Sequence, residues 1–141
     1  MYLKKLLPED IRGPWNIYGI CTDRMVCEVE NYLLGIETDK KGISFAAIFN
    51  VVNERGPFSL PKTICHLVDE NEKIYEFVKG NYRVLFFTDA DKLVICCNCF
   101  LKQTQKTPLL EANTAKRAKQ KYFIDKANKN IMIIREESNG G

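Results

Sequence analysis

The first third of the chain has an apolar segment followed by two stretches with helical spacing. Residues 15–21, WNIYGIC, come directly after a Gly-Pro turn signal and are typical of a strand. From residue 22 to 36, apolar residues recur at helical intervals behind two N-cap candidates, Thr22 and Asp23. This stretch predicts a first helix.

A second helix is predicted after the polar segment TDKKG. Its apolar stripe consists of Ile43, Ala46, Ala47, Phe49 and Val51. The segment ERGP at residues 54–57 ends it, because glycine favours a left-handed helix cap and proline cannot continue the helix. Two helices joined by a short polar loop form an αα-hairpin.

The pattern then changes to that of strands. Four strands are predicted, namely TICHLV, KIYEFV, NYRVLFFT and KLVICCNCFL. The links at residues 79–82, with Gly80 in a tight turn, and at residues 89–91 are short enough to impose antiparallel pairing. Simple alternation places Leu93, Ile95, Cys97 and Cys99 on one face of the fourth strand, and Val94, Cys96 and Phe100 on the other. Because both faces are apolar, this strand is expected at the centre of the sheet.

The last regular element is predicted to be a helix. Thr107 is its expected N-cap and Pro108 its first residue, and its packing stripe is Ala112, Ala115, Ala118 and Tyr122. The tail at 131–141 has a short apolar run that either adds a strand or forms a loose terminus. The order β-α-α-β-β-β-β-α predicts an α+β fold: a small antiparallel sheet, an N-terminal αα-hairpin and a C-terminal helix. We expect a single domain over residues 1–141, with a core at about 15–125.

Composition excludes several classes of protein. No apolar run approaches the ~18 residues that span a membrane, and no signal-peptide core precedes Pro8, so a cytoplasmic protein is expected. Six cysteines without a secretory signal are expected to be reduced thiols. Their spacing, with His66 as the single histidine, matches neither a zinc site nor a redox motif. We therefore expect no metal and no cofactor.

Positive charge is concentrated near the C-terminus. Between residues 102 and 129 there are eight basic residues against two acids, so this segment carries +6 and the remainder −3, for a net charge of +3. This charge distribution suggests an anionic partner, although by charge alone a solvated, lysine-rich helix face is the simpler explanation. Arg83 stands in an otherwise apolar strand, where it either pairs with a carboxylate such as Glu76 or faces an anion-binding groove.

Phosphate-binding glycine loops, nucleophile elbows and metalloprotease motifs are absent from the sequence. The segments that remain are ERGP, IYEF, YRVLFF and CFLKQTQKTP, followed by an alanine-spaced basic helix. Together they resemble the RelE/HigB-like toxin superfamily, and most closely its phage-derived, HigB-type branch. The resemblance runs from about residue 15 to 123, and residues 100–108 are its most specific part.

The resemblance implies the toxin of a type II toxin–antitoxin pair: a ribosome-dependent endoribonuclease that cuts mRNA. The ribose 2′-OH would attack the adjacent phosphate, so neither a metal nor a protein nucleophile is needed. Expected partners are mRNA on the ribosome, ribosomal RNA and a small helix-turn-helix antitoxin. The implied catalytic residues are Arg83, Lys102, Lys106 and His66. The implied RNA-binding residues are Lys79, Tyr82, Lys116, Arg117, Lys119 and Lys121.

Two positions depart from the family pattern. Val78 replaces the usual arginine after the YEL-like unit, and Gln103 replaces the second lysine of the KKTQKTP-like unit. Loss of two cations from an electrostatic site weakens catalysis. The alternative to a toxin nuclease is therefore a catalytically weak or inactive module that binds RNA or protein through the same basic face.

Overall fold

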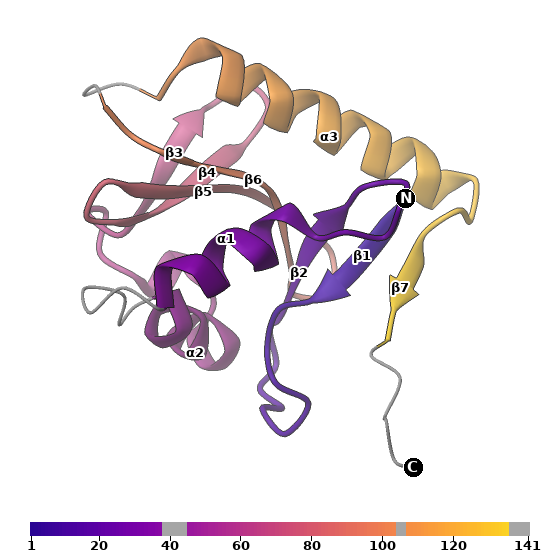
Figure 1. Ribbon diagram of the computed structural model, residues 1–141, viewed down its shortest axis with the longest axis horizontal. Coiled ribbons are helices and arrows are strands. Elements are labelled where there is room, and N and C mark those ends of the chain that lie inside the picture. Colours follow the sequence, from indigo (N-terminus) through magenta and orange to yellow (C-terminus); the bar gives the residue numbers. More distant parts are fainter. Residues whose placement is uncertain (38–44, 104–106, 136–141) are drawn as a thin grey trace.

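The structure, a computed structural model, describes residues 1–37, 45–103 and 107–135. These residues form a seven-stranded sheet in the order β3-β4-β5-β6-β2-β1-β7. The strands are β1 (Tyr2–Lys5), β2 (Asn16–Cys21), β3 (Cys65–Asp69), β4 (Ile74–Lys79), β5 (Tyr82–Asp89), β6 (Leu93–Leu101) and β7 (Met132–Ile134). The helices are α1 (Glu28–Glu37), α2 (Phe45–Arg55) and α3 (Leu109–Ala127), with a short 3-10 turn η1 (Pro57–Ser59). Figure 1 shows α3 along one face of the sheet and α1 and α2 against the other.

Each face of the sheet has its own apolar core. On the α1 and α2 side, the fully buried rings of Phe77 and Phe86 stack with centroids 4.0 Å apart, and Phe49 of α2 meets Phe77 edge-on at 5.7 Å. On the α3 side, a second cluster includes Leu85, Phe87, Ile95, Ala115 and Tyr122. Small alanines on α3 let the helix approach closely, as expected from its stripe.

The predicted elements β-α-α-β-β-β-β-α correspond to β2 through α3, but a further strand, β1 or β7, lies at each end of this order, and the sheet is larger than predicted and not purely antiparallel. The strands β3 to β6 form an antiparallel meander, with Gly80 at φ 57 in the β4–β5 turn. However, β2 pairs with β6 in parallel, and β7 pairs in parallel with β1. Within the N-terminal arm (residues 1–14), Tyr2–Lys5 form a strand that was not predicted, and the apolar run of the tail adds a strand at the sheet edge.

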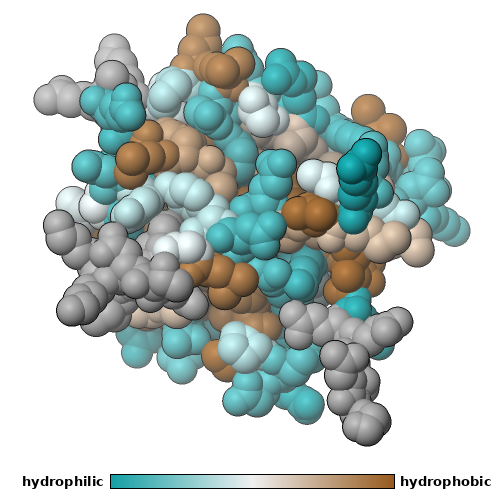
Figure 2. Space-filling view, viewed as in Figure 1, coloured by the Kyte–Doolittle hydropathy of each residue, from teal (hydrophilic) through white to brown (hydrophobic). Residues whose placement is uncertain are grey.

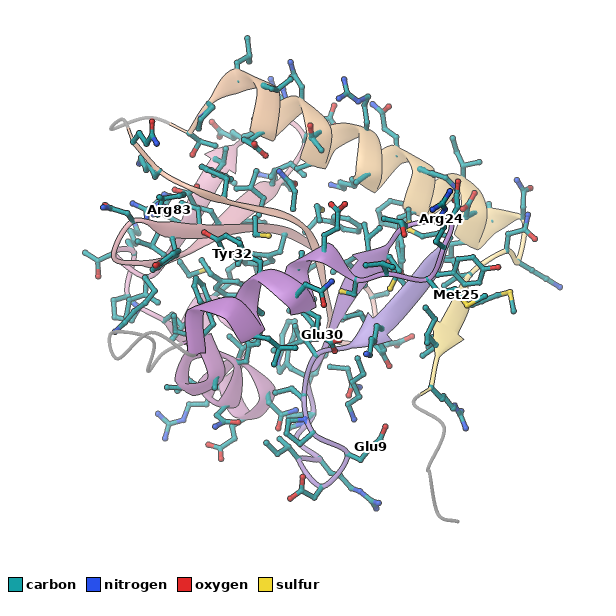
Figure 3. All side chains as sticks on the ribbon, in the orientation of Figure 1. Glu9, Arg24, Met25, Glu30, Tyr32 and Arg83 are labelled. Carbon is teal, nitrogen blue, oxygen red and sulfur yellow. The ribbon has the colours of Figure 1, made fainter. Side chains whose placement is uncertain are left out.

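The first helix begins later than predicted. Residues 22–26 form a turn, in which the Thr22 amide donates to the Val26 carbonyl at 2.8 Å and Met25 has φ 64. A bridge between Cys21 and Cys27 closes this turn, so the helix starts only at Glu28. Met25 is therefore exposed, and it lies near β7 in Figure 3 rather than in the core.

The second helix ends where predicted but buries a different stripe. Gly56 has φ 85 directly after α2, and its amide donates to the Val52 carbonyl at 2.8 Å. The buried positions of α2 are Phe45, Ile48, Phe49, Val52 and Asn53, whereas Ala46, Ala47 and Val51 are exposed. Of the predicted stripe, Phe49 is buried as expected, but Ala46 and Ala47 are exposed, because a small alanine fits on either face of a helix. The predicted Ile43 lies outside the described residues.

A bulge in β6 changes the expected alternation of its side chains. Leu85 of β5 opposes Asn98 and Phe86 opposes Cys96, so Cys97 is the extra residue. As a result Cys96 and Cys99 both face the α1 and α2 side, while Cys97 and Phe100 face α3. Cys99 and Phe100 are thus on the faces opposite to those predicted. The strand is central, between β5 and β2, as expected.

Among the described residues, no helix combines the length and apolar character that crossing a bilayer requires. The face of the molecule in Figure 2 is mixed, with hydrophobic patches set among hydrophilic residues. Exposed apolar side chains on α3 include Leu109 and Leu110, at 73% and 71% exposure, close to the start of the helix.

Candidate functional site

A hollow of about 390 Å³ lies on the α3 side of the sheet, where β3 and β4 meet the start of α3. Its ionisable lining residues are His66, Asp69, Glu76, Lys102 and Lys116. They come from β3, β4, the segment after β6 and α3, so only the folded chain brings them together. Thr107 adds a hydroxyl, and Leu67 and Leu109 add apolar surface.

A second hollow of about 460 Å³ lies between the N-terminal arm, α1 and α2. Most of its lining is apolar, and two of its charged residues, Lys4 and Glu30, form an ion pair at 2.7 Å. None of the residues that the sequence assigned to chemistry lines it. The hollow near α3 is therefore the better candidate for a reactive site.

Glu76 is the structural centre of the candidate site. Its side chain is fully buried on β4, yet both carboxylate oxygens have partners. Oε1 lies 2.6 Å from Nε2 of His66 on β3, and Oε2 accepts a hydrogen bond from the Thr107 hydroxyl at 2.9 Å. The Arg83 Nε lies 3.7 Å from Oε1. These partners compensate for burying a carboxylate, which without them is very costly.

Sequence reasoning missed Glu76 as a site residue. It appeared there only as a pairing partner for Arg83, because one acid among eighteen has no local feature that distinguishes it. The one usable signal was its position. In the strand IYEF, Glu76 lies between apolar neighbours, where a carboxylate is stable only if it is paired.

Arg83 is beside Glu76 but does not line the hollow. It is 8% exposed, and one terminal nitrogen, Nη1, donates to the carbonyls of Gly80 at 2.6 Å and Tyr82 at 3.0 Å. Its Nε is buried and has no hydrogen-bond partner among the described residues. Figure 3 places Arg83 at the end of the sheet near β5, away from Met25. The pairing with Glu76 that the sequence offered as one of two readings is present in the structure.

Thr107 is not the helix cap that the sequence predicted. The α3 helix begins at Leu109 with Pro108 at the capping position, and no side chain caps it. The hydroxyl of Thr107 instead donates to Glu76, across from the helix start. Because its acceptor is a buried carboxylate, this hydrogen bond is a strong one.

Of the two lysines predicted as catalytic in the loop before α3, Lys102 and Lys106, the structure describes one. Lys102 lines the hollow, half-buried, and its amide donates to the Asn81 carbonyl at 2.6 Å. Lys106 lies outside the described residues. Lys79 is exposed beside the β4–β5 turn, and Tyr82 packs on the opposite face of the sheet, edge-on to Tyr32 at 5.9 Å. Of the three described residues, Lys102, Lys79 and Tyr82, only Lys102 lines the hollow.

The predicted basic face of α3 is largely engaged with the protein itself. Lys116 pairs with Asp69 on β3 at 2.6 Å, Lys119 donates to the Glu72 carbonyl, and Lys121 pairs with Asp125 at 2.6 Å. Arg117 is exposed and makes a 3.5 Å contact to the Thr114 hydroxyl. Of the four, Lys116 also lines the hollow.

Further along α3, a second group of charges fixes the helix to the sheet. Asp89 at the end of β5 accepts hydrogen bonds from the Tyr122 hydroxyl and from Lys126, each at 2.6 Å. Burial opposes the charge on Asp89, yet the donors from Lys126 and Tyr122 hold its pKa below the ordinary value. This charged network, together with the buried alanines, fixes α3 against the sheet over the hollow.

The cysteines are all free thiols in the structure. Burial raises the pKa of Cys21, Cys65 and Cys99 to about 12 in each case, which makes these thiols poor nucleophiles at neutral pH. In residues 1–37, 45–103 and 107–135, no group of three or more His, Cys, Asp or Glu side chains is arranged to hold a metal ion.

The family model described as Phage derived protein Gp49-like (DUF891) matches residues 33–120. The matched region includes α2, the meander from β3 to β6 and the start of α3, and it contains every residue that lines the hollow. No curated protein matches the chain.

Proposed function

This chain belongs to the phage-derived Gp49-like family, a RelE/HigB-like family associated with toxin–antitoxin systems, and on that premise we propose that it is the toxin of such a pair. In this proposal, residues 1–141 form one domain that cleaves mRNA on the ribosome. A small helix-turn-helix antitoxin, its cognate partner, neutralises it.

The observation that carries the proposal is the hollow between β3, β4 and α3. There, Lys102, Lys116 and His66 face a space of about 390 Å³ beside the start of a nineteen-residue helix. Cationic side chains and a helix N-terminus both favour a phosphate group. An RNA strand offers such a phosphate at every nucleotide.

The reaction that fits these residues is metal-independent cleavage. The ribose 2′-oxygen attacks the adjacent phosphorus, the bond to the 5′-oxygen breaks, and the RNA is left with a 2′,3′-cyclic phosphate and a 5′-hydroxyl. Lys102 would stabilise charge on the transition state, and His66 would transfer a proton. Arg83 would act indirectly: it would balance the charge of Glu76 and would not contact the phosphate.

The test is cleavage of a defined mRNA by purified protein in the presence of translating ribosomes. Wild type is expected to produce discrete cuts whose 5′-hydroxyl ends accept a phosphate from a polynucleotide kinase. Lys102→Ala is expected to cut about 10²-fold more slowly. If wild type makes no cuts, or if Lys102→Ala cuts as fast as wild type, the nuclease proposal is wrong.

A non-catalytic binding module is the second candidate, and one observation favours it. Val78 replaces the arginine expected in the family pattern, and the remaining strand arginine, Arg83, is buried outside the hollow. Such a module would bind RNA in a salt-dependent manner without cutting it. Binding with no cleavage in the same ribosome assay would support this candidate.

A further inference from the structure

Cys21 and Cys27 oppose one another across the turn that precedes α1. A hydrogen bond from the Thr22 amide to the Val26 carbonyl closes this turn one residue inside the Cys21–Cys27 bridge. The two cysteines therefore form a non-hydrogen-bonded pair. At such a pair the opposite side chains of an antiparallel ladder lie closest, with Cα atoms about 4.5 Å apart. Both thiols face the core on the α1 and α2 side of the sheet.

Both sulfur atoms lie against Gly19, which is on the same face of β2 as Cys21. The Cys21 Sγ is 3.7 Å from the Gly19 carbonyl oxygen, and a Cβ atom on Gly19 would lie 2.5 Å from the Cys27 Sγ. A disulfide requires Cα atoms about 4.4–6.8 Å apart and side chains that point towards each other. The fold therefore brings these two thiols within range of a disulfide bond.

None of the other four cysteines opposes a cysteine in the sheet register; these four are Cys65, Cys96, Cys97 and Cys99. Cys96 and Cys99 face the same core as Cys27, so they are its competing partners. However, they come from β6, in the middle of the sheet, and no bridge joins either of them to Cys27. The register thus favours Cys21 as the partner of Cys27.

The turn between the two cysteines gives a small molecule a route to the sulfur atoms. Cys21 and Cys27 are only 8% and 4% exposed, but residues 22–26 are all exposed. Met25 has φ 64, a left-handed conformation that is strained for a residue with a side chain. Exposed segments of this kind open locally at a lower free energy than the core does. Opening of this turn would admit a small disulfide such as oxidised glutathione.

Cys27 is the better nucleophile of the pair. It directly precedes the first residue of α1, and although burial raises its pKa, a hydrogen bond from the Glu30 backbone amide lowers it. For Cys21, burial and the neighbouring Cys27 thiol together raise the pKa to about 12. A thiolate therefore forms more readily on Cys27, and Cys21 is placed to attack second.

We propose that Cys21 and Cys27 form a reversible disulfide when the chain meets a small disulfide oxidant such as oxidised glutathione, and that this bond stabilises the junction of β2 with α1. The Cys27 thiolate attacks one sulfur of the oxidant, whose S–S bond breaks and releases one glutathione thiol. The Cys21 thiolate then attacks the Cys27 sulfur of the mixed disulfide and releases the second glutathione thiol. The protein is oxidised by two electrons and the oxidant is reduced to two thiols. The hollow lies on the other face of the sheet, so this inference does not depend on the nuclease proposal.

Peptide mapping can identify the bond. Trypsin cleaves after Arg24, between the two cysteines, so the disulfide holds together two peptides that otherwise separate. The folded, reduced protein is incubated with oxidised glutathione, its remaining thiols are alkylated, and it is digested. We expect the peptide that ends at Arg24 to be linked to the peptide that begins at Met25, and dithiothreitol to separate them. Linkage of Cys27 to the peptide that contains Cys96 and Cys99, or no linkage at all, would overturn the proposal.

Alanine variants assign the bond to individual thiols. Cys21→Ala and Cys27→Ala should each abolish the linked peptide, whereas Cys65→Ala, the matched control, should retain it. Cys65 is also buried, at 6% exposure, but it opposes Phe77 and no cysteine. Circular dichroism shows whether each variant folds, and either of the first two suffices if the other does not. Loss of the linked peptide in Cys65→Ala would contradict the assignment.

The stabilising role has its own readout. A bond that closes the loop of residues 21–27 reduces the entropy of the unfolded chain, so the oxidised protein should melt about 5 °C above the reduced protein. Dithiothreitol should restore the lower melting temperature, and Cys21→Ala should melt at one temperature whether or not the oxidant was added. An unchanged or lower melting temperature of the linked wild type would show that the bond does not stabilise the junction.

Discussion

The Lys116 amine lies 2.6 Å from the Asp69 carboxylate, so a lysine that the sequence directs towards RNA joins α3 to β3. The contact is at the edge of the hollow that both residues line. Lys102, in the same hollow, has no ion pair among the described residues, and its amine is the better placed of the two to meet a phosphate.

Lys102→Ala and Lys116→Ala should separate RNA contact from structural support. Each phosphate contact that is lost lowers the slope of log affinity against log salt by about 1, so Lys102→Ala should reduce the salt dependence of RNA binding by that amount. Lys116→Ala should instead lower the melting temperature and change the slope less. A salt titration of RNA binding and a thermal melt check both. Equal slopes for the two variants would contradict the assignment.

Arg83→Ala should lower the free energy of unfolding by about 3 kcal/mol, because it leaves the buried Glu76 without its guanidinium. It also removes the two hydrogen bonds from Nη1 to the β4–β5 turn. Urea unfolding measures the loss. Arg117→Ala is the matched control, since Arg117 is exposed on α3 and should change stability by less than about 0.5 kcal/mol. Equal stability of the two variants would show that Arg83 does not support Glu76.

Acidification should loosen the end of α3 that Asp89 holds. The pKa of Asp89 is lowered from its ordinary value of 3.8, and that of Asp125 is lowered by hydrogen bonds from Lys121 and the N-terminal amine. A carboxyl with a lowered pKa in the folded state stabilises the protein above its unfolded pKa. That stability is lost as pH falls from about 5 to about 2. Melting temperatures over this range should fall less steeply for Asp89→Asn than for wild type.

Thiol reactivity should report the burial of the cysteines. The raised pKa values of Cys21, Cys65 and Cys99 predict slow reaction with a disulfide reagent at pH 8, although all six cysteines are free thiols. Six thiols per chain should react rapidly once guanidinium unfolds the protein. Rapid reaction of the native protein at several thiols would mean that Cys21, Cys65 and Cys99 are not packed as described.

Two glycines with positive φ should respond differently to alanine. At Gly56, with φ 85, a Cβ atom would lie 2.7 Å from the Trp15 ring, so Gly56→Ala adds a steric clash to backbone strain. At Gly80, with φ 57, a Cβ atom would meet nothing within 4 Å. We expect Gly80→Ala to cost about 1 kcal/mol and Gly56→Ala at least twice as much in urea unfolding. Equal costs would contradict the packing of Trp15 on the α2 terminus.

Elements with strong local signals were predictable from the sequence. The tight turn at Gly80 and the end of α2 at Gly56 follow from residues that tolerate positive φ, and the strands follow from apolar runs between turn signals. The predicted start of the first helix was wrong, because Met25 has a positive φ and no glycine in the sequence marks a turn there. The parallel pairing of β2 with β6 joins residues more than seventy positions apart, which no local pattern encodes.

At the candidate site, the difference between what the sequence determines and what the tertiary structure determines is larger. By itself the sequence determined the order of the elements from β2 to α3, the antiparallel meander from β3 to β6 and the cationic segment that contains Lys102. Only the tertiary structure decided that Glu76, Thr107 and His66 meet, that Lys116 is paired, and that Cys97 forms a bulge. Local propensity and periodicity are set by neighbours along the chain. The pairing of charges and hydroxyls depends instead on distances between elements, which exist only once the sheet register and the docking of α3 are fixed.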